Sequence, residues 1–205
     1  TTVHYNPSSE ELADIACQTA EIAKNLGYNP RVAMLSFANF GNPAIEGTER
    51  VHGAIEVLNS RKVDFEYDGE MTVDVALNPK SLAFYPFCRL SRPANILIMP
   101  GLHSANIASR LIDSVGAGKT IGPLLTGLKH SAQIVKVGAS VSEIVTLALF
   151  AAYDSSKPNT FSSSDNNKLM SKKAEVVKNK IYYFICNFFF NSFFFFITFP
   201  FKLFF

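Results

Sequence analysis

Apolar and polar positions along Thr1–Asp154 follow two periods, which predict helices and strands in turn. Ser8 and Glu11 form a capping box that predicts the start of a helix, and Gly27 is a typical helix stop. The expected inward stripe of this helix is Leu12, Ile15, Thr19, Ile22, Ala23 and Leu26.

The remaining patterned segments alternate between short apolar runs and longer amphipathic ones. Such alternation predicts an α/β fold, a three-layer αβα arrangement with a mostly parallel sheet. The expected strands are Arg31–Phe37, Phe65–Glu70, Asn95–Pro100 and Thr120–Leu125. The expected helices are Gly47–Asn59, Leu102–Val115 and Ser140–Tyr153, the last with a Ser140/Glu143 capping box and with Ile144, Val145, Leu147 and Ala148 facing inward.

The acidic stretch after Tyr67 leaves two interpretations open. If Glu70 begins a helix, Glu70 and Asp74 lie four positions apart on one helix face. That face points either into a cleft or to solvent, where first-turn acids are favoured by the helix dipole.

The composition changes sharply after Asp154. Residues 155–180 are rich in Ser, Asn and Lys and predict a disordered linker, since they cannot repay the entropy of ordering. Nearly half of Ile181–Phe205 is Phe. This tail is long enough to anchor in a bilayer and apolar enough to aggregate, but its composition favours a third interpretation, an artefact of translation past the end of the gene.

Charge and cysteine usage exclude several classes of function. The net charge of +2 comes without a basic stripe interleaved with aromatics, which argues against nucleic acid as a partner. Cys17, Cys88 and Cys186 lie too far apart for a zinc site or a disulfide framework, so we expect a cytoplasmic protein. A membrane is a partner only if the Phe-rich tail is real.

Two features of the sequence resemble a P-loop and a metal ligand without meeting the requirements of either. Gly116–Thr120 resembles the end of a phosphate-binding P-loop, but Asp113 stands where that motif needs Gly, and the run follows a helix instead of preceding one. His103 has no second ligand at metal spacing, so no metal site is expected.

The carboxyl ends of the expected strands are the candidate ligand site, because ligands of open α/β sheets bind there. Ser36, Asn39 and Gly41 follow one strand, and His103, Ser104 and Asn106 follow another. The alternatives are turn geometry for the first group and helix capping for the second. Arg89 and Arg92 are either solvated charges or contacts to phosphates.

Several linked motifs carry a resemblance that spans Thr1–Asp154. They are RVAMLSFANFGNP, DGEMTVDVALNP, ANILIMPGLHSANIASRLI, IGPLLTGL and VGASVSEIV. In this order they resemble phosphate acetyl/butyryltransferases, and most closely the phosphotransacetylase-like C-terminal domain of bacterial NADP-dependent malic enzymes. The resemblance implies a two-lobe domain with an acyl-CoA and phosphate site in the cleft, of which this chain is a fragment holding the second half.

Departures from the family pattern bear on the expected activity. The resemblance places Lys136-Val137 where active members carry a Ser-Arg pair that grips acyl phosphate, and Glu143 where they carry the base for the CoA thiol. We therefore expect an acetyl-CoA-binding regulatory and oligomerisation module, a homo-oligomer, with malate oxidation, NADP and a divalent metal belonging to an upstream half.

Two alternatives remain open. One is a divergent phosphate acetyltransferase, which moves acetyl between CoA and phosphate with Glu143 as base and Lys136 as cation. The other is a truncated product without a stable fold.

Overall fold

The computed structural model describes residues 5–43, 47–116, 121–126, 128 and 130–155. The predicted linker beyond Ser155 and the Phe-rich tail lie outside the described residues. The described part of the chain forms two compact units, one within residues 5–116 and one within residues 121–155.

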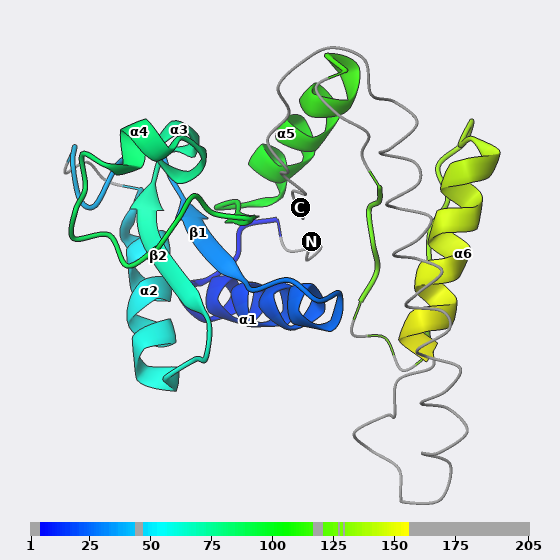
Figure 1. Cartoon of the computed structure of the whole chain (residues 1–205), viewed down its shortest axis with the longest axis horizontal. Coiled ribbons are helices and arrows are strands. Elements are labelled where there is room, and N and C mark those ends of the chain that lie inside the picture. Colours follow the sequence, from blue (N-terminus) through cyan, green and yellow to red (C-terminus); the bar gives the residue numbers. More distant parts are fainter. Residues whose placement is uncertain (1–4, 44–46, 117–120, 127, 129, 156–205) are drawn as a thin grey trace, which may run out of the picture. The chain divides into compact units, whose positions relative to one another are not determined.

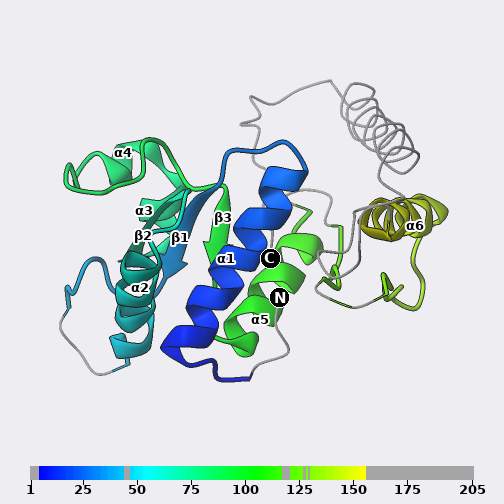
Figure 2. The same ribbon diagram turned by 90° about the horizontal axis from the view of Figure 1, so that it is seen from below.

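Three parallel strands form the centre of the first unit. They are β1 (Arg31–Leu35), β2 (Glu66–Met71) and β3 (Ile96–Ile98), in the order β2-β1-β3; Figure 1 labels β1 and β2, and Figure 2 labels all three strands. β1 and β3 coincide with apolar runs of the sequence, as expected for strands covered on both faces. The predicted α/β fold with a parallel sheet is therefore confirmed.

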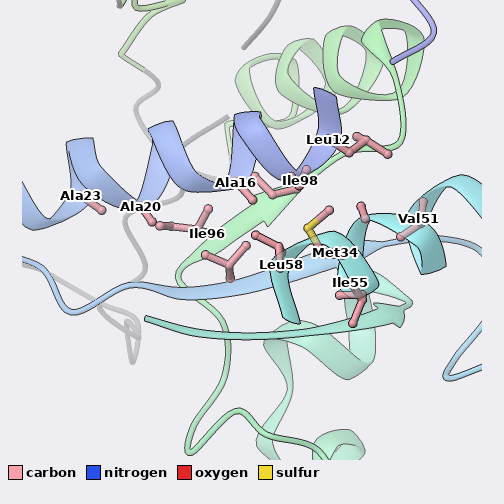
Figure 3. Close-up of a cluster of buried hydrophobic side chains, with 13 residues drawn as sticks. Leu12, Ala16, Ala20, Ala23, Met34, Val51, Ile55, Leu58, Ile96 and Ile98 are labelled. Carbon is pink, nitrogen blue, oxygen red and sulfur yellow. The ribbon is translucent and has the colours of Figure 1, made fainter. Parts of the chain in front are cut away.

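One face of the sheet is covered by α1 (Ser9–Asn25) and α2 (Glu49–Arg61). Their buried side chains pack against alternate positions of β1 and β3, as Figure 3 shows. Leu58 of α2 and Met34 of β1 are completely buried in this cluster. The cluster consists of Leu12, Ala13, Ala16, Ala20, Ala23, Val32, Met34, Val51, Ala54, Ile55, Leu58, Ile96 and Ile98.

Helix α1 begins at the predicted capping box, with Ser8 as N-cap and the Glu11 carboxylate accepting from the Ser8 N–H. Its buried stripe differs from the predicted one. Alanines occupy the centre of the contact, and Ile15 and Ile22 lie on its flanks, half-buried. Small side chains let the helix approach the sheet closely, a preference that hydrophobicity alone does not reveal. The buried positions are Leu12, Ala13, Ala16, Ala20 and Ala23.

The opposite face of the sheet carries a second apolar cluster. Ala33 and Leu35 of β1 and Leu97 of β3 meet residues from the segment after β2. That segment contains α3 (Val73–Leu77) and α4 (Pro79–Leu82), which Figure 2 shows beside the ends of β1 and β2. The sheet is thus covered on both faces. The other members of this cluster are Met71, Val75, Ala76, Leu90 and Ala94.

The helical interpretation of Glu70 is wrong. Glu70 lies in β2, and α3 begins three positions later, so Glu70 and Asp74 do not share a helix face. Met34 pairs with Gly69 and Leu35 pairs with Met71, so Glu70 is an extra residue in the ladder. This β-bulge lies near the end of β2, beside the turn that follows β1.

Helix α5 (Leu102–Ser114) follows β3 and has no fully buried side chain among its residues. Its exposed apolar positions include Ile107, Leu111 and Val115 beyond its end. The helix agrees with the predicted range to within one residue at its C-terminal end.

The second unit contains α6 (Val141–Ser155), which begins at the predicted Ser140/Glu143 box. The predicted strand Thr120–Leu125 is wrong over the described residues 121–125, which are irregular. The Gln133 side chain instead bonds both backbone groups of Leu125, at 3.0 and 2.9 Å, and replaces a strand partner.

The predicted inward face of α6 is confirmed only in part. Leu147 is buried together with Thr146, whereas Ile144, Val145 and Ala148 are exposed. α6 is apolar nearly all round, so its sequence pattern does not select one face. In the described part of the chain, no helix combines the length and the apolarity that a membrane crossing requires.

Candidate functional site

The turn after β1 lies at the carboxyl edge of the sheet, where the sequence places one group of candidate residues. Asn39 and Asn42 bond each other through both backbone groups, at 2.9 and 3.0 Å. Gly41 has φ 83°, which a residue without a Cβ adopts readily. Ser36 precedes the turn and donates its N–H to the Met71 carbonyl at 3.0 Å.

Asn39 ties this turn to the end of β2. Its side-chain oxygen accepts from the Thr72 N–H at 2.8 Å and from the Thr72 hydroxyl at 3.1 Å. No protein partner of the Asn39 amide NH2 occurs among the described residues, so this group is able to donate to a ligand.

Glu70 anchors the same turn from the other side. Its backbone carbonyl accepts from the Phe40 N–H at 2.8 Å, and its Oε1 accepts from the Gly41 N–H at 3.1 Å. The side chain is 1% exposed, and its Oε2 is buried without a partner in the described part of the molecule. A buried carboxylate oxygen without a hydrogen-bond partner is costly in free energy.

These contacts bear on the predicted anion site. The backbone N–H groups of Asn39, Phe40, Gly41 and Asn42 all donate to protein acceptors. A phosphate bound at Gly41 would have to displace Glu70 and would face its carboxylate. The geometry favours a hydrogen-bonding or aromatic contact at this turn over a phosphate cradle.

The second group of candidates lies at the start of α5. His103 Nε2 is hydrogen-bonded to the Tyr5 hydroxyl, and the two rings meet edge to face with centroids 4.6 Å apart. Ser104 donates its hydroxyl to the Gly101 carbonyl at 2.8 Å, and Asn106 accepts from Arg110 at 2.8 Å. The N-cap is Gly101, which makes no side-chain cap, so the capping interpretation of these residues is wrong.

Lys136 and Glu143, the predicted catalytic pair, are brought together in the second unit. Lys136 Nζ lies 3.4 Å from Glu143 Oε1. Glu143 Oε2 accepts from the Ser140 N–H at 2.7 Å and from the Ser140 hydroxyl at 2.8 Å. Both carboxylate oxygens are therefore engaged.

The bonds at Glu143 also set its acidity. The backbone and side chain of Ser140, and then Lys136, lower the pKa of Glu143 below its ordinary value of 4.5. A carboxylate whose pKa is lowered is a weaker base. Glu143 is thus better suited to start a helix than to take a proton from a thiol.

The surroundings of the pair offer little to a phosphate. Val137 is fully exposed and supplies no charge. A hollow of about 10 Å³ lies beside the pair, close to the space that one water molecule needs. It is lined by Ile121, Gly122, Lys136, Ala139, Glu143 and Leu147.

Arg89, which the sequence leaves as either a solvated charge or a contact to phosphates, is held by neighbouring side chains. It bonds Asp68 at 3.2 Å and Asn59 at 2.7 Å, and its guanidinium lies 4.6 Å from the centre of the Tyr67 ring. The buried Asp68 also accepts from the Arg89 N–H at 2.6 Å. Arg92 is exposed.

Cys88 packs next to this network. Burial raises the pKa of its thiol to about 11, so the thiol is protonated and unreactive at neutral pH. Within the described ranges, no three His, Cys, Asp or Glu side chains are placed to hold a metal ion together.

Sequence reasoning missed the roles of Asp68 and Glu70. Both acids alternate with Tyr67 and Gly69 in a segment predicted to be extended, which places the two acids on one face of a strand. Acids on a strand face beside an apolar sheet signal buried, hydrogen-bonded groups.

Comparisons with known proteins extend this picture. The family model described as Phosphate acetyl/butaryl transferase matches residues 1–152. An NADP-dependent malic enzyme from Rhizobium meliloti is 54% identical over 154 residues, which is 75% of this chain and 20% of that enzyme. A phosphate acetyltransferase from Clostridium acetobutylicum is 35% identical over 147 residues, 71% of this chain and 44% of that enzyme.

A solved structure agrees with the fold. A phosphotransacetylase from Streptococcus pyogenes superimposes with a TM-score of 0.67 at 33% identity, over 72% of this chain and 45% of that chain. The chain thus spans about a fifth of the length of the malic enzyme and less than half of the length of the transferases.

Proposed function

The chain belongs to the phosphate acetyl/butaryl transferase family, as its linked motifs predicted, and from this premise we propose that it is an acetyl-CoA-binding module of an NADP-dependent malic enzyme. In this proposal the module binds acetyl-CoA without transferring the acetyl group to phosphate. It regulates and assembles a cytoplasmic enzyme whose malate, NADP and metal sites belong to other parts of the protein.

The observation that carries the proposal is the state of Glu143. Transfer of acetyl from CoA to phosphate needs a base for the thiol and cations for the phosphate. Glu143 is engaged by Ser140 and Lys136, and the neighbouring Val137 is apolar and exposed. The 54% identity to the malic enzyme from Rhizobium meliloti also supports the proposal.

Calorimetric titration of the full chain with acetyl-CoA tests binding, and thiol release from acetyl-CoA in the presence of phosphate tests turnover. We expect saturable binding and no phosphate-dependent thiol release. Phosphate-dependent release would instead favour the phosphate acetyltransferase alternative, with Glu143 as base and Lys136 as cation.

The regulatory part of the proposal needs the complete enzyme. Acetyl-CoA is expected to change the rate of malate-dependent NADP reduction, and sedimentation is expected to show a homo-oligomer. An enzyme whose rate and assembly are indifferent to acetyl-CoA and to deletion of this module would contradict the regulatory role.

A further inference from the structure

Three aromatic rings meet at the carboxyl edge of the sheet, and we propose that they seat the adenine ring of acetyl-CoA. This aromatic cluster consists of Phe40, Tyr85 and Phe87. Ligands of open parallel sheets bind at this edge, and stacking on aromatic rings is a common way to hold a base. The inference rests on the proposed function, because it names the part of the molecule that receives the nucleotide end of that ligand.

The cluster is fixed on one side and open on the other. The Phe40 and Phe87 rings meet edge to face at 5.0 Å, and the Tyr85 centroid lies 5.2 Å from Phe40 and 6.0 Å from Phe87. Phe40 and Tyr85 pack on the second apolar cluster of the sheet, whereas Phe87 is 64% exposed. A rigid ring with an exposed face loses little freedom when a base stacks on it.

Phe40 is held in an unusual conformation. Its φ is 52°, in the left-handed region that a bulky residue rarely adopts. The Phe40 and Gly41 N–H groups both bond the buried Glu70, which keeps the turn in this shape. Local strain held by surrounding bonds is typical of ligand sites, and here it aims a ring at Phe87.

The charge of the neighbouring segment suits a phosphorylated ligand. Residues 78–93 contain Lys80, Arg89 and Arg92 and no acid. Arg89 is engaged by Asp68, but Lys80 is exposed on α4 and has no ion-pair partner within the described part of the chain. α3 and α4 follow directly from the end of β2 (Figure 1), so Lys80 of α4 lies beyond the carboxyl end of that strand.

The size of the cluster favours a base over a protein partner. Stable protein interfaces bury roughly 800 Å² on each side. Of the three rings here, two are already packed on the core, so the exposed area is closer to that of one base than to that of an interface.

The test compares Phe87→Leu with Phe84→Leu in the full chain. Phe84 belongs to the same loop and is 82% exposed, but its ring contacts none of the three cluster rings among the described contacts. Each protein is titrated calorimetrically with acetyl-CoA, with acetyl-pantetheine and with adenosine 3′,5′-bisphosphate. Sedimentation of the same proteins reports association, and circular dichroism reports folding.

We expect F87L to lower the affinity for acetyl-CoA and for the bisphosphate by about 5- to 150-fold and to leave the affinity for acetyl-pantetheine unchanged. F84L should bind all three ligands as the wild type does. Equal acetyl-CoA affinity of F87L and wild type would overturn this inference and leave the proposed function standing. Bisphosphate binding that needs Phe87, without acetyl-CoA binding, would support the cluster and contradict the proposed function. Altered sedimentation of F87L with unchanged nucleotide affinity would mark a protein contact and overturn the inference.

Discussion

At the scale of single residues, two glutamates show how a carboxylate is constrained by backbone amides. Glu143 is exposed to solvent in part and shares its oxygens between Ser140 and Lys136. Glu70 is buried, bonds Gly41 with one oxygen, and keeps the other without a partner in the described part. The first arrangement stabilises a helix start, and the second holds the turn that carries Asn39 and Phe40.

Gly69 illustrates the close approach that brings Glu70 to the turn. A Cβ at Gly69 would lie 2.5 Å from the Met34 carbonyl oxygen, and its φ is 150°. Gly69→Ala is therefore expected to lower the free energy of unfolding by roughly 2 to 5 kcal/mol, from strain and overlap together. Urea denaturation measures this change.

Gly27→Ala is the matched control for that prediction. Gly27 also has positive φ, 86°, but open space at its Cβ position. The free energy of unfolding of Gly27→Ala should fall only by the cost of a positive φ for alanine, on the order of 1 kcal/mol. Equal losses in the two variants would mean that overlap with Met34 does not matter.

The acidity of Glu143 gives a second prediction at this scale. Folding lowers the pKa of Glu143 below its ordinary value of 4.5. The ionised Glu143 therefore contributes its full stabilisation at a pH above that ordinary value, and the contribution is lost as the pH falls through the folded-state pKa. Carboxyl NMR titration should show Ser140→Ala moving the midpoint of Glu143 upward, and by more than Lys136→Gln does. A Glu143 midpoint at or above the ordinary value in the wild type would contradict the geometry.

At the scale of elements, α1 and α2 are fitted to each other through small residues. Gly53 of α2 faces Ser9 at the start of α1, and a Cβ there would lie 2.6 Å from the Ser9 hydroxyl oxygen. That hydroxyl donates to the Arg50 carbonyl at 3.0 Å, so the two helices are joined at this point. Ion pairs of Arg61 with Asp14 and of Lys24 with Asp64 add links between neighbouring elements.

This contact reverses an ordinary rule. Gly→Ala inside a helix usually adds about 1 kcal/mol of stability. Gly53→Ala should instead lower the melting temperature, and Ser9→Ala in the same chain should recover part of the loss, since the nearest atom is then removed. A Gly53→Ala variant as stable as the wild type would show that α1 and α2 separate without cost.

Much of the fold could be predicted because apolar runs and capping boxes act locally. β1, β3 and the starts of α1 and α6 follow from such signals. The irregular course of residues 121–125 could not be predicted, because Gln133, distant in sequence, supplies the bonds that a strand would have made. The bulge at Glu70 also depends on a partner strand that local pattern does not contain.

The candidate site was predictable in location more than in chemistry. The fold class predicts a site at the carboxyl edge of the sheet, and the turn that contains Asn39 and Gly41 follows the end of β1 there. The Gly41 N–H donates its hydrogen bond to Glu70, whose side chain reaches the turn from another strand. Spacing along the chain gives no signal for such a contact.

At the scale of the molecule, the larger of the two apolar clusters in the first unit is shared by α1, α2, β1 and β3. Leu58 is completely buried in it, so Leu58→Ala should cost about 2 to 5 kcal/mol. Hydrogen exchange should then rise together in these four elements. Leu58→Met, which keeps most of the volume, should cost under about 1.5 kcal/mol.

An exchange increase confined to α2 in Leu58→Ala would contradict a shared cluster. It would mean that α2 opens alone and that the sheet keeps its cover from α1. A common increase would instead establish a cooperative unit, and it would exclude the interpretation that the chain lacks a stable fold.

The extra residue in β2 also determines which changes in chain length this molecule could tolerate. If Glu70 were deleted, Gly69 and Met71 would become neighbours, and their pairings with Met34 and Leu35 would continue as a regular ladder. Side chains of β2 would still alternate between the two faces of the sheet. The Phe40 and Gly41 N–H groups, however, would lose their acceptors, the backbone carbonyl and the Oε1 of Glu70. A one-residue deletion at Glu70 would therefore keep the sheet and remove the bonds that hold the turn. Such a chain would keep the fold of the family and lose the local structure of the candidate site.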